Sequence, residues 1–364
     1  MKKNAIVYCE NEFGKIDGKL ANGLVRHSDN YTIIGIIDST RSGLDAGEYL
    51  DGKKNGIPIF STINIAMDYL DPAPEYFIYG MAPLESFLDE QQREIFFIAM
   101  KHGLNIVNGL AEYFTEDQEF IQKAEEANVE IIDIRKPLPR KELHHFSGRI
   151  FAVNIPVITV LGTDCAVGKR TTALLLVQAL KQEGLKASFI STGQTGLIQG
   201  AKYGIAIDVL SSGYATGAVE NAVVNAYENE RPDIIIVEGQ GALSHPAFLS
   251  SCAILKGAQP DAIILQHAPR RKIRCDYPNI SVPTLASEIE LLEVFSKRKV
   301  IAIGINHEAM TDPELVDTIR IYEMKYQRPT TDVLKYGCEK LVNEILAVFP
   351  ALQKRISMLC QAQE

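Results

Sequence analysis

The chain has 364 residues, a formal net charge of −9 at pH 7, and 46% hydrophobic residues. This length exceeds what one hydrophobic core usually serves, so two domains are expected. The negative charge argues against a nucleic-acid-binding surface, and the apolar runs are too short to span a membrane.

The six cysteines are scattered and include no C-x-x-C pair, and the first residues do not resemble a signal peptide. We therefore expect a reduced, cytoplasmic protein that acts on a small-molecule substrate and binds neither nucleic acid nor membranes. The sequence leaves open whether the chain forms a homo-oligomer.

Short apolar runs alternate with helical patterns over residues 1–140. The runs are 5–9, 31–37, 57–60, 76–79, 104–107 and 129–134, and helical segments lie near 64–70, 85–102 and 116–128. Strands that alternate with helices predict a parallel sheet covered on both faces. The sequence therefore predicts an α/β fold whose N-terminal part, residues 1–140, is a Rossmann-like domain.

Asp38 ends the second predicted strand, where dinucleotide-binding domains place an acid that contacts a ribose hydroxyl. The G-x-G-x-x-G turn that such domains require is missing from residues 9–18. A fold kept for packing, or for presenting the loop 38–47, is therefore favoured over NAD(P) binding.

The composition changes over residues 135–155, which contain prolines, several basic residues and the adjacent pair His144 and His145. We interpret residues 141–155 as a linker and residues 156–364 as the second domain. The two histidines are interpreted as solvated linker residues, because neighbours in sequence point in different directions.

A phosphate-binding loop is predicted where the second domain begins. An apolar strand starting at Val157 leads into a turn bracketed by Gly162 and Gly168, and a helix with Lys169 follows. Backbone N–H groups at the start of a helix are unpaired and lie at the positive end of its dipole, so they can bind an anion. The predicted cofactor-binding residues are Gly162, Thr163, Asp164, Ala166, Val167, Gly168, Lys169, Arg170, Thr171 and Thr172.

The loop departs from the common G-x-x-x-x-G-K-[ST] pattern in two ways. Five residues separate its glycines, and Arg170 stands where a serine or threonine is usual. A hydroxyl ligand for magnesium would have to come from Thr171 or Thr172, so phosphate binding is better supported than metal binding.

Polar residues follow the later strands of the second domain, which we predict to be a P-loop NTPase-like α/β domain. The glycine-rich turn 191–200 follows the strand 187–190, and Asn306 and His307 follow the strand 300–305. Because open parallel sheets bind ligands at the carboxyl ends of their strands, these residues should gather at one site. The predicted substrate-binding residues are Thr192, Gln194, Thr195, Gln240, Arg270, Arg271 and Arg274.

Glu238, His245 and His267 are the candidate catalytic residues, because each lies at or just after the end of a predicted strand. Glu238 could hold magnesium, act as a general base, or only orient the phosphate loop. Each histidine could accept a proton from a substrate amine or could be structural. The three arginines could bind carboxylates or phosphates in a bidentate manner, or could form an exposed basic turn.

The motif GTDCAVGK, with Glu238-Gly239-Gln240-Gly241 downstream, resembles dethiobiotin synthetase and related enzymes with deviant phosphate loops. Nearly the whole chain resembles a bacterial and archaeal family long catalogued as of unknown function, in which D-glutamate N-acetyltransferases have been recognised. The segments that carry this resemblance are DSTRSGLDAGE, DIRKP, GTDCAVGKRTT, STGQTGLIQG, VEGQGALSHPA and LQHAPRR.

Three hypotheses follow. The family resemblance implies acetyl transfer from acetyl-CoA to an acidic D-amino acid such as D-glutamate, with the loop binding CoA phosphates. The dethiobiotin synthetase resemblance implies an ATP- and Mg-dependent ligase or kinase acting on a small carboxylate, with Thr171 and Glu238 as metal ligands. The third is a nucleotide-responsive regulatory protein that binds without turnover.

Overall fold

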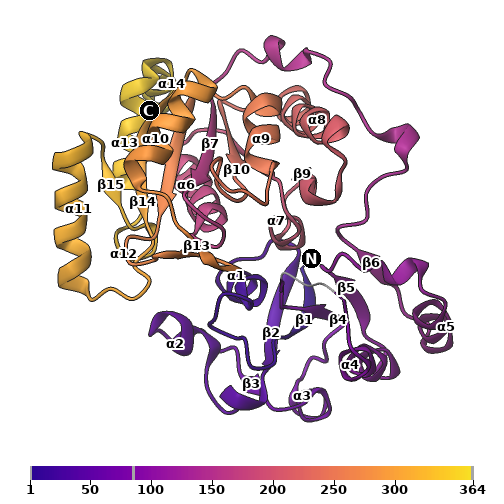
Figure 1. The fold of residues 1–364 in the computed structure, drawn as a ribbon. Coiled ribbons are helices and arrows are strands. Elements are labelled where there is room, and N and C mark those ends of the chain that lie inside the picture. The colour runs from indigo at the N-terminus through magenta and orange to yellow at the C-terminus, as the bar shows by residue number, and fades with distance from the viewer. Residues whose placement is uncertain (1, 84–86, 362–364) are drawn as a thin grey trace. The chain divides into compact units, whose positions relative to one another are not determined.

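The computed structural model describes residues 2–83 and 87–361, and of residues 359–361 only the backbone. The chain divides into two compact units (Figure 1). The first comprises Met1–Pro137 with Gln194–Ala201, and the second comprises Leu138–Gly193 with Lys202–Glu364. No helix among the described residues combines the length and the apolar character needed to cross a membrane.

The first unit is built on a six-stranded parallel sheet of order β3-β2-β1-β4-β5-β6. This is the strand order of Rossmann-like domains, so the predicted fold of this part is confirmed. Its strands are β1 (Lys3–Tyr8), β2 (Tyr31–Ile37), β3 (Ile59–Phe60), β4 (Tyr76–Tyr79), β5 (Asn105–Asn108) and β6 (Ile131–Asp133). Its helices are α1 (Lys19–Arg26), α2 (Ala46–Asp51), α3 (Ile63–Tyr69), α4 (Glu90–Lys101), α5 (Gln118–Ala127) and α7 (Gln194–Gln199).

Both faces of this sheet are covered because side chains along a strand alternate between faces. In β1, Ile6 and Tyr8 pack with residues of α3, α4 and α5, whereas Ala5 and Val7 pack with residues of α1 and α2. The helix α4 begins after Asp89, whose side chain accepts the backbone N–H of Gln92. Glu85, where the sequence predicts this helix to begin, lies outside the described residues.

Asp38 joins two loops of the first unit through one carboxylate oxygen, while its Oδ2 is buried and makes no hydrogen bond among the described residues. Its Oδ1 accepts the backbone N–H of Asn11, from the loop after β1, and the N–H and hydroxyl of Thr40. Asp38 is fully buried, so its role in the structure is to hold the two loops together.

The second unit has a seven-stranded parallel sheet of order β15-β14-β11-β7-β10-β8-β9. Its strands are β7 (Val157–Gly162), β8 (Ala187–Ser191), β9 (Tyr203–Gly204), β10 (Ile234–Glu238), β11 (Ala262–His267), β14 (Lys299–Ile305) and β15 (Thr330–Thr331). A separate antiparallel hairpin is formed by β12 (Ile273–Arg274) and β13 (Tyr277–Ser281). Its helices are α6 (Lys169–Gln182), α8 (Ser212–Glu230), α9 (Ser250–Ala258), α10 (Leu285–Ser296), α11 (Asp312–Tyr326), α12 (Val333–Tyr336), α13 (Glu339–Val348) and α14 (Pro350–Gln361).

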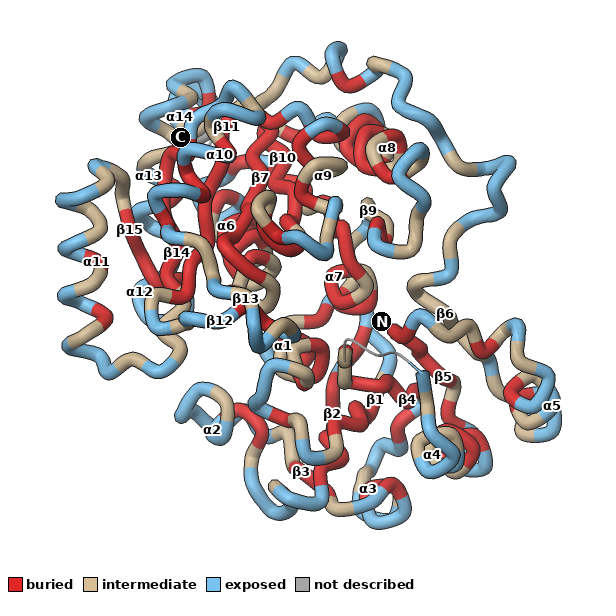
Figure 2. Tube along the Cα trace, in the orientation of Figure 1, coloured by how far each residue is buried: buried red, intermediate tan, exposed pale blue. Residues whose placement is uncertain are grey.

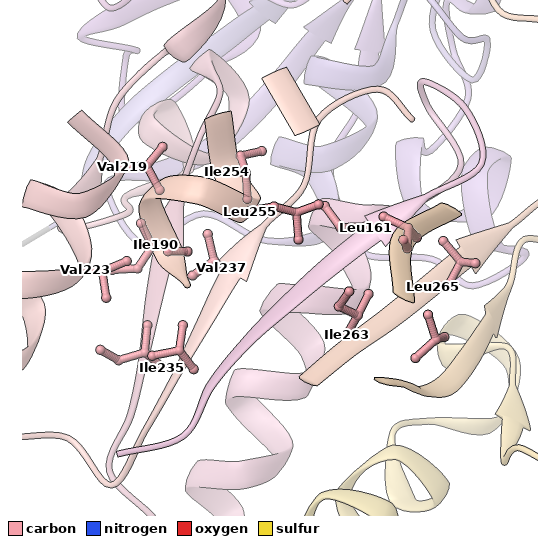
Figure 3. Packing of buried hydrophobic residues seen from close by; sticks show 14 of the residues in the cluster. Leu161, Ile190, Val219, Val223, Ile235, Val237, Ile254, Leu255, Ile263 and Leu265 are labelled. Atoms are coloured by element: carbon pink, nitrogen blue, oxygen red, sulfur yellow. The ribbon is translucent and has the colours of Figure 1, made fainter. Parts of the chain in front are cut away.

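Two apolar clusters hold this sheet between helices. On one face, Leu161, Ile235 and Ile263 pack with residues of α8 and α9 (Figure 3). On the other, Val160 and Ile236 pack with residues of α6 and α13. The central strands β7 and β10 are therefore buried on both faces (Figure 2), as the unbroken apolar runs in their sequences predict.

The segment after β8 differs from the sequence-based expectation. We predict a glycine-rich turn within the second domain over 191–200, but Gln194–Gln199 forms α7 and groups with the first unit. There Ile198 is fully buried in the core, and the Gln199 amide donates to the backbone oxygens of Gly23 and His27 at 2.8 and 2.7 Å. The conformation of α7 thus depends on Gly23 and His27, which are distant from it in sequence.

Candidate functional site

The strand β7 and the helix α6 are joined by the predicted phosphate loop. Gly168 has φ +101°, and Ala166 has φ +49°, so the loop uses left-handed backbone conformations. A Cβ at Gly162 would lie 2.8 Å from the Val167 side chain, so the loop also needs a glycine there. Gly168 is the N-cap of α6 and makes no side-chain capping hydrogen bond, which leaves the first N–H groups of the helix available to an anion.

Lys169 lies inside this loop rather than on its surface. The residue is 6% exposed, and Nζ donates to the backbone oxygen of Asp164 at 2.5 Å. Burial lowers the Lys169 pKa, while Cys165, Asp164 and Glu238 oppose that shift. A phosphate at the loop would meet this buried cation at a point where water screens it little.

Two arginines support the loop from the chain after β11. Arg271 Nη1 donates to Asp164 Oδ2 at 3.1 Å and to the Cys165 backbone oxygen at 2.6 Å, and its other end pairs with Glu308. Arg274 Nη2 donates to the Ser244 hydroxyl at 2.9 Å. Both arginines are therefore committed to protein contacts.

The three predicted substrate-binding arginines are not brought together. Arg270 is half-exposed and pairs with Glu314 on α11, whereas Arg271 and Arg274 are buried against the loop. Arg274 Nε is buried and makes no hydrogen bond among the described residues.

Asp164, Cys165 and His245 each bring one potential metal-ligating atom within 4.8 Å of the others. His245 Nδ1 accepts a backbone N–H two residues ahead at 3.2 Å, so the neutral ring carries its proton on Nε2 and offers no lone pair there. Arg271 and Arg274 lie 3.1 and 3.9 Å from the Asp164 carboxylate oxygens and would repel a cation. Tautomer and charge both disfavour a metal ion at this cluster.

The same hydrogen bond bears on the predicted catalytic role of His245. With Nδ1 occupied by the backbone and a proton on Nε2, the neutral ring can donate a hydrogen bond but cannot accept a proton at Nε2. Burial, with Arg274 as the next contribution, lowers the His245 pKa. His245 Nε2 is buried without a partner 3.9 Å from Asp164 Oδ1.

Glu238 ends β10 beside the loop strand β7, where it pairs in register with Val160. Its Oε2 accepts the Ser191 hydroxyl at 2.8 Å and the Thr192 N–H at 3.1 Å. Burial raises the Glu238 pKa, while Arg170, Ser191, Thr192 and Lys169 lower it. The carboxylate is thus held by donors and faces two cations.

Thr192 and Gln240, both predicted to bind substrate, lie around Glu238. Thr192 Oγ1 donates to the Glu238 backbone oxygen at 3.0 Å, and Gln240 Nε2 donates to Thr192 Oγ1 at 3.2 Å. Gln194 and Thr195 belong to α7 of the first unit, so they are not part of the site that the second unit forms by itself.

Of the two threonines proposed as a magnesium ligand, Thr172 is fully buried and its hydroxyl donates to Gln266 Oε1 at 3.0 Å. Thr171 is partly exposed. Lys169 and Arg170 already interact with the Glu238 carboxylate, so a metal ion bound by Thr171 and Glu238 would lie near two positive charges. The charges around the loop therefore suit an anion better than a second cation.

His267 ends β11 and is tied to the loop by a 2.8 Å hydrogen bond between Nδ1 and Thr163 Oγ1. The residue is 6% exposed. Burial, with a smaller contribution from Arg271, lowers the His267 pKa from 6.5 to about 4. His267 is consequently neutral at physiological pH and part of the loop's support.

Acidification is expected to destabilise the second unit through His267. Because its pKa is about 4 when folded and about 6.5 when unfolded, the unfolded state takes up the proton first as the pH falls. The stabilisation is complete above about pH 6.5 and is lost progressively towards about pH 4. Urea unfolding should show a loss of about 2 kcal/mol between pH 7 and pH 5 from this group. His267→Gln should flatten that dependence, and an unchanged slope would contradict the assignment.

One polar pair at the strand ends is absent from the predicted catalytic residues. His307, two residues beyond β14, has Nδ1 at 2.6 Å from Asp332 Oδ2. The sequence places His307 after a strand, which was a usable signal. Asp332 lies 25 residues later, at the N-cap of the four-residue helix α12, and had no local signal.

Two family models cover most of the chain. The P-loop domain of DUF1611, described as a domain of unknown function, matches residues 144–342, and the Rossmann-like domain DUF1611_N matches residues 39–137. A crystal structure of a DUF1611 family protein from Anabaena variabilis has a TM-score of 0.86 and 25% identity, and the match covers 95% of this chain and all of that one.

Curated relatives carry a functional name. The chain is 31% identical over 273 residues to a D-glutamate N-acetyltransferase of Pseudoalteromonas sp., covering 73% of this chain and 80% of the relative. It is 26% identical over 277 residues to a D-glutamate N-acetyltransferase of Tritonibacter scottomollicae, covering 74% and 81%. The family resemblance drawn from the six sequence segments is confirmed.

Proposed function

The chain belongs to the DUF1611 family, and from this premise we propose that it is an N-acetyltransferase that moves acetyl from acetyl-CoA to the amine of an acidic D-amino acid such as D-glutamate. The observation that carries the proposal is a phosphate loop surrounded by fixed cations, in a chain whose curated relatives are named D-glutamate N-acetyltransferase.

The residues of the loop fit the phosphates of CoA. The helix α6 has an uncapped N-terminus, Lys169 is a buried cation, and Gly168 permits close approach of the backbone. In this proposal Lys169 and the loop N–H groups bind phosphate, and Arg271 and Glu238 keep the loop and its cations in place. Acetyl-CoA supplies a thioester, which is an acyl group already activated for attack by an amine.

The acceptor attacks the thioester carbonyl as the neutral amine, and its nitrogen loses one proton as it attacks. The amine nitrogen then forms the new C–N bond, the C–S bond breaks, and the sulfur leaves with the electron pair and is protonated to the free thiol. For the carboxylates of the acceptor we propose the guanidinium of Arg274, whose buried Nε makes no hydrogen bond among the described residues.

The ATP-dependent alternative would use the same loop, with Thr171 and Glu238 as ligands of magnesium. The two hypotheses differ in which nucleotide binds and in whether a metal is needed. Thermal unfolding with acetyl-CoA, CoA, ATP or ADP, each with magnesium or with a chelator, separates them directly.

We expect CoA and acetyl-CoA to raise the unfolding temperature by the same amount with the chelator as with magnesium. A ligand at about a hundred times its dissociation constant adds about 2.7 kcal/mol to the free energy of unfolding. Incubation with acetyl-CoA and D-glutamate should then release free thiol, with L-glutamate and D-alanine as comparison acceptors. Stabilisation by ATP alone, and only with magnesium, would overturn the acetyltransferase proposal in favour of the ligase.

A further inference from the structure

The pair His307 and Asp332 has the geometry of a positioned general base. Asp332 is 1% exposed, and its carboxylate accepts the backbone N–H groups of His307, Leu334 and Lys335 at 3.2, 3.0 and 3.1 Å. Backbone N–H groups can only donate, so both carboxylate oxygens of Asp332 act as acceptors in these contacts. The 2.6 Å contact with His307 Nδ1 is therefore a hydrogen bond donated by the imidazole.

This hydrogen bond fixes the tautomer of His307. With the proton on Nδ1, the neutral ring has its lone pair on Nε2, where a proton can be accepted. The His307 side chain is 33% exposed, so the ring is reachable from solvent. Neither predicted catalytic histidine combines these features, because His245 carries its proton on Nε2 and His267 is 6% exposed.

The chain on both sides of His307 is tied to the phosphate loop. The N–H of Asn306 donates to the backbone oxygen of His267 at 2.8 Å. Glu308 pairs with Arg271, which in turn donates to Asp164 in the loop. His307 thus belongs to the same edge of the sheet as the loop.

The separation between the loop and His307 suits CoA. In the sheet β14 is two strands from β7, which places them about 10 Å apart at a strand spacing of roughly 4.8 Å. The long pantetheine arm of CoA separates its thioester from its phosphates. A base that serves the thioester must therefore lie away from the loop, whereas Glu238 and His267 contact the loop strand or the loop itself.

We propose that His307 is the general base that takes the proton from the acceptor amine, and that Asp332 is the residue that positions it. This inference rests on the proposed acetyl transfer. Nε2 accepts the amine proton as the nitrogen attacks the thioester carbonyl, and the imidazolium then returns the proton to the departing CoA sulfur. The ring ends the cycle neutral, and no further reactant is needed.

The charges around His307 affect its titration. The hydrogen bond that His307 donates to Asp332 raises the His307 pKa, while burial and Lys335 lower it and Asp312 raises it. Lys335 and Asp312 pair with each other at 3.0 Å, so their effects partly cancel. The rate should increase with pH through the pKa of His307, because only the neutral ring accepts a proton.

The test uses the full-length chain, acetyl-CoA, and the acceptor that gives turnover with the wild type. His307→Gln should lower kcat by about 10²- to 10⁴-fold, the usual contribution of a general base, with the thermal stabilisation by CoA unchanged. His144→Gln, at an exposed position of the same unit, is the matched control and should keep the wild-type rate. Added imidazole should partly restore the rate of His307→Ala.

The Asp332→Asn variant tests the positioning role through the pH dependence of kcat/KM, which a purely structural role of Asp332 would not shift. Loss of the carboxylate should shift the acidic limb of the kcat/KM profile to lower pH and reduce the plateau. Full kcat in His307→Gln, or an Asp332→Asn profile that falls in height with no shift along the pH axis, would overturn the base assignment. If the wild type acetylates no amino acid, the proposed function itself fails, and the two failures are thereby told apart.

Discussion

Replacing Arg271 by alanine is expected to lower the free energy of unfolding by about 3–5 kcal/mol, the usual cost of breaking a buried ion pair from one side. The Arg271 side chain is only 6% exposed and joins Asp164 of the loop to Glu308 beyond β14. Its removal would leave Asp164, whose carboxylate is fully buried, without its closest cation, and the Cys165 backbone oxygen without a donor at 2.6 Å. Urea unfolding monitored by circular dichroism measures the change.

Arg270→Ala is the matched control for this prediction. Arg270 is adjacent in sequence, but its side chain is 51% exposed and pairs with Glu314 at the surface. Surface ion pairs contribute little to stability, so this variant should unfold close to the wild type. Equal loss of stability in the two variants would show that Arg271 does not brace the loop, and that the basic segment acts only through its total charge.

The contrast between these arginines marks what the sequence could not predict. Arg270, Arg271 and Arg274 form one basic cluster in the sequence, and this pattern predicts that all three bind the substrate. Their roles diverge because the partners of Arg271 and Arg274 come from distant segments, among them Asp164 and Ser244. Local sequence gives the charge of such residues, but only the fold gives their partners.

Strands and the phosphate loop were predictable because their signals are local. The runs 31–37 and 76–79 coincide with β2 and β4, and the turn from Gly162 to Gly168 lies between β7 and α6. Apolar runs and required glycines reflect burial and backbone conformation, which act on the residues themselves. The helix α7 was missed because Gln199 and Ile198 are held by the first unit, far away in sequence.

The roles of the histidines likewise depend on partners that the sequence does not show. His245, His267 and His307 all follow strands, and the sequence cannot distinguish them. What separates them is the group on Nδ1: a backbone N–H at His245, a threonine hydroxyl at His267 and a carboxylate at His307. At His245 and His307 the partner decides which nitrogen holds the proton. A hydroxyl can donate or accept, so it is burial that sets His267 apart.

Lys169→Met is expected to weaken binding of CoA by roughly 10- to 100-fold, because a hydrogen bond to a charged group contributes about 1.5–3 kcal/mol. The variant keeps the length of the side chain and the loop backbone, so the remaining affinity reports the N–H groups of α6. Titration calorimetry measures the dissociation constant. Lys181→Met, at an exposed position of the same helix, removes the same charge without touching the loop and should bind like the wild type.

Without a ligand, Lys169→Met should leave the free energy of unfolding unchanged or raise it. Burial lowers the Lys169 pKa, so holding the charge costs more in the folded loop than in the unfolded chain, and an apolar side chain relieves that cost. Lys169 therefore lowers the free energy of unfolding when the loop is empty, and its charge becomes favourable when the loop binds an anion. Unchanged CoA affinity in this variant would mean that the loop is not the phosphate site, and a large loss of stability without ligand would mean that Lys169 is structural.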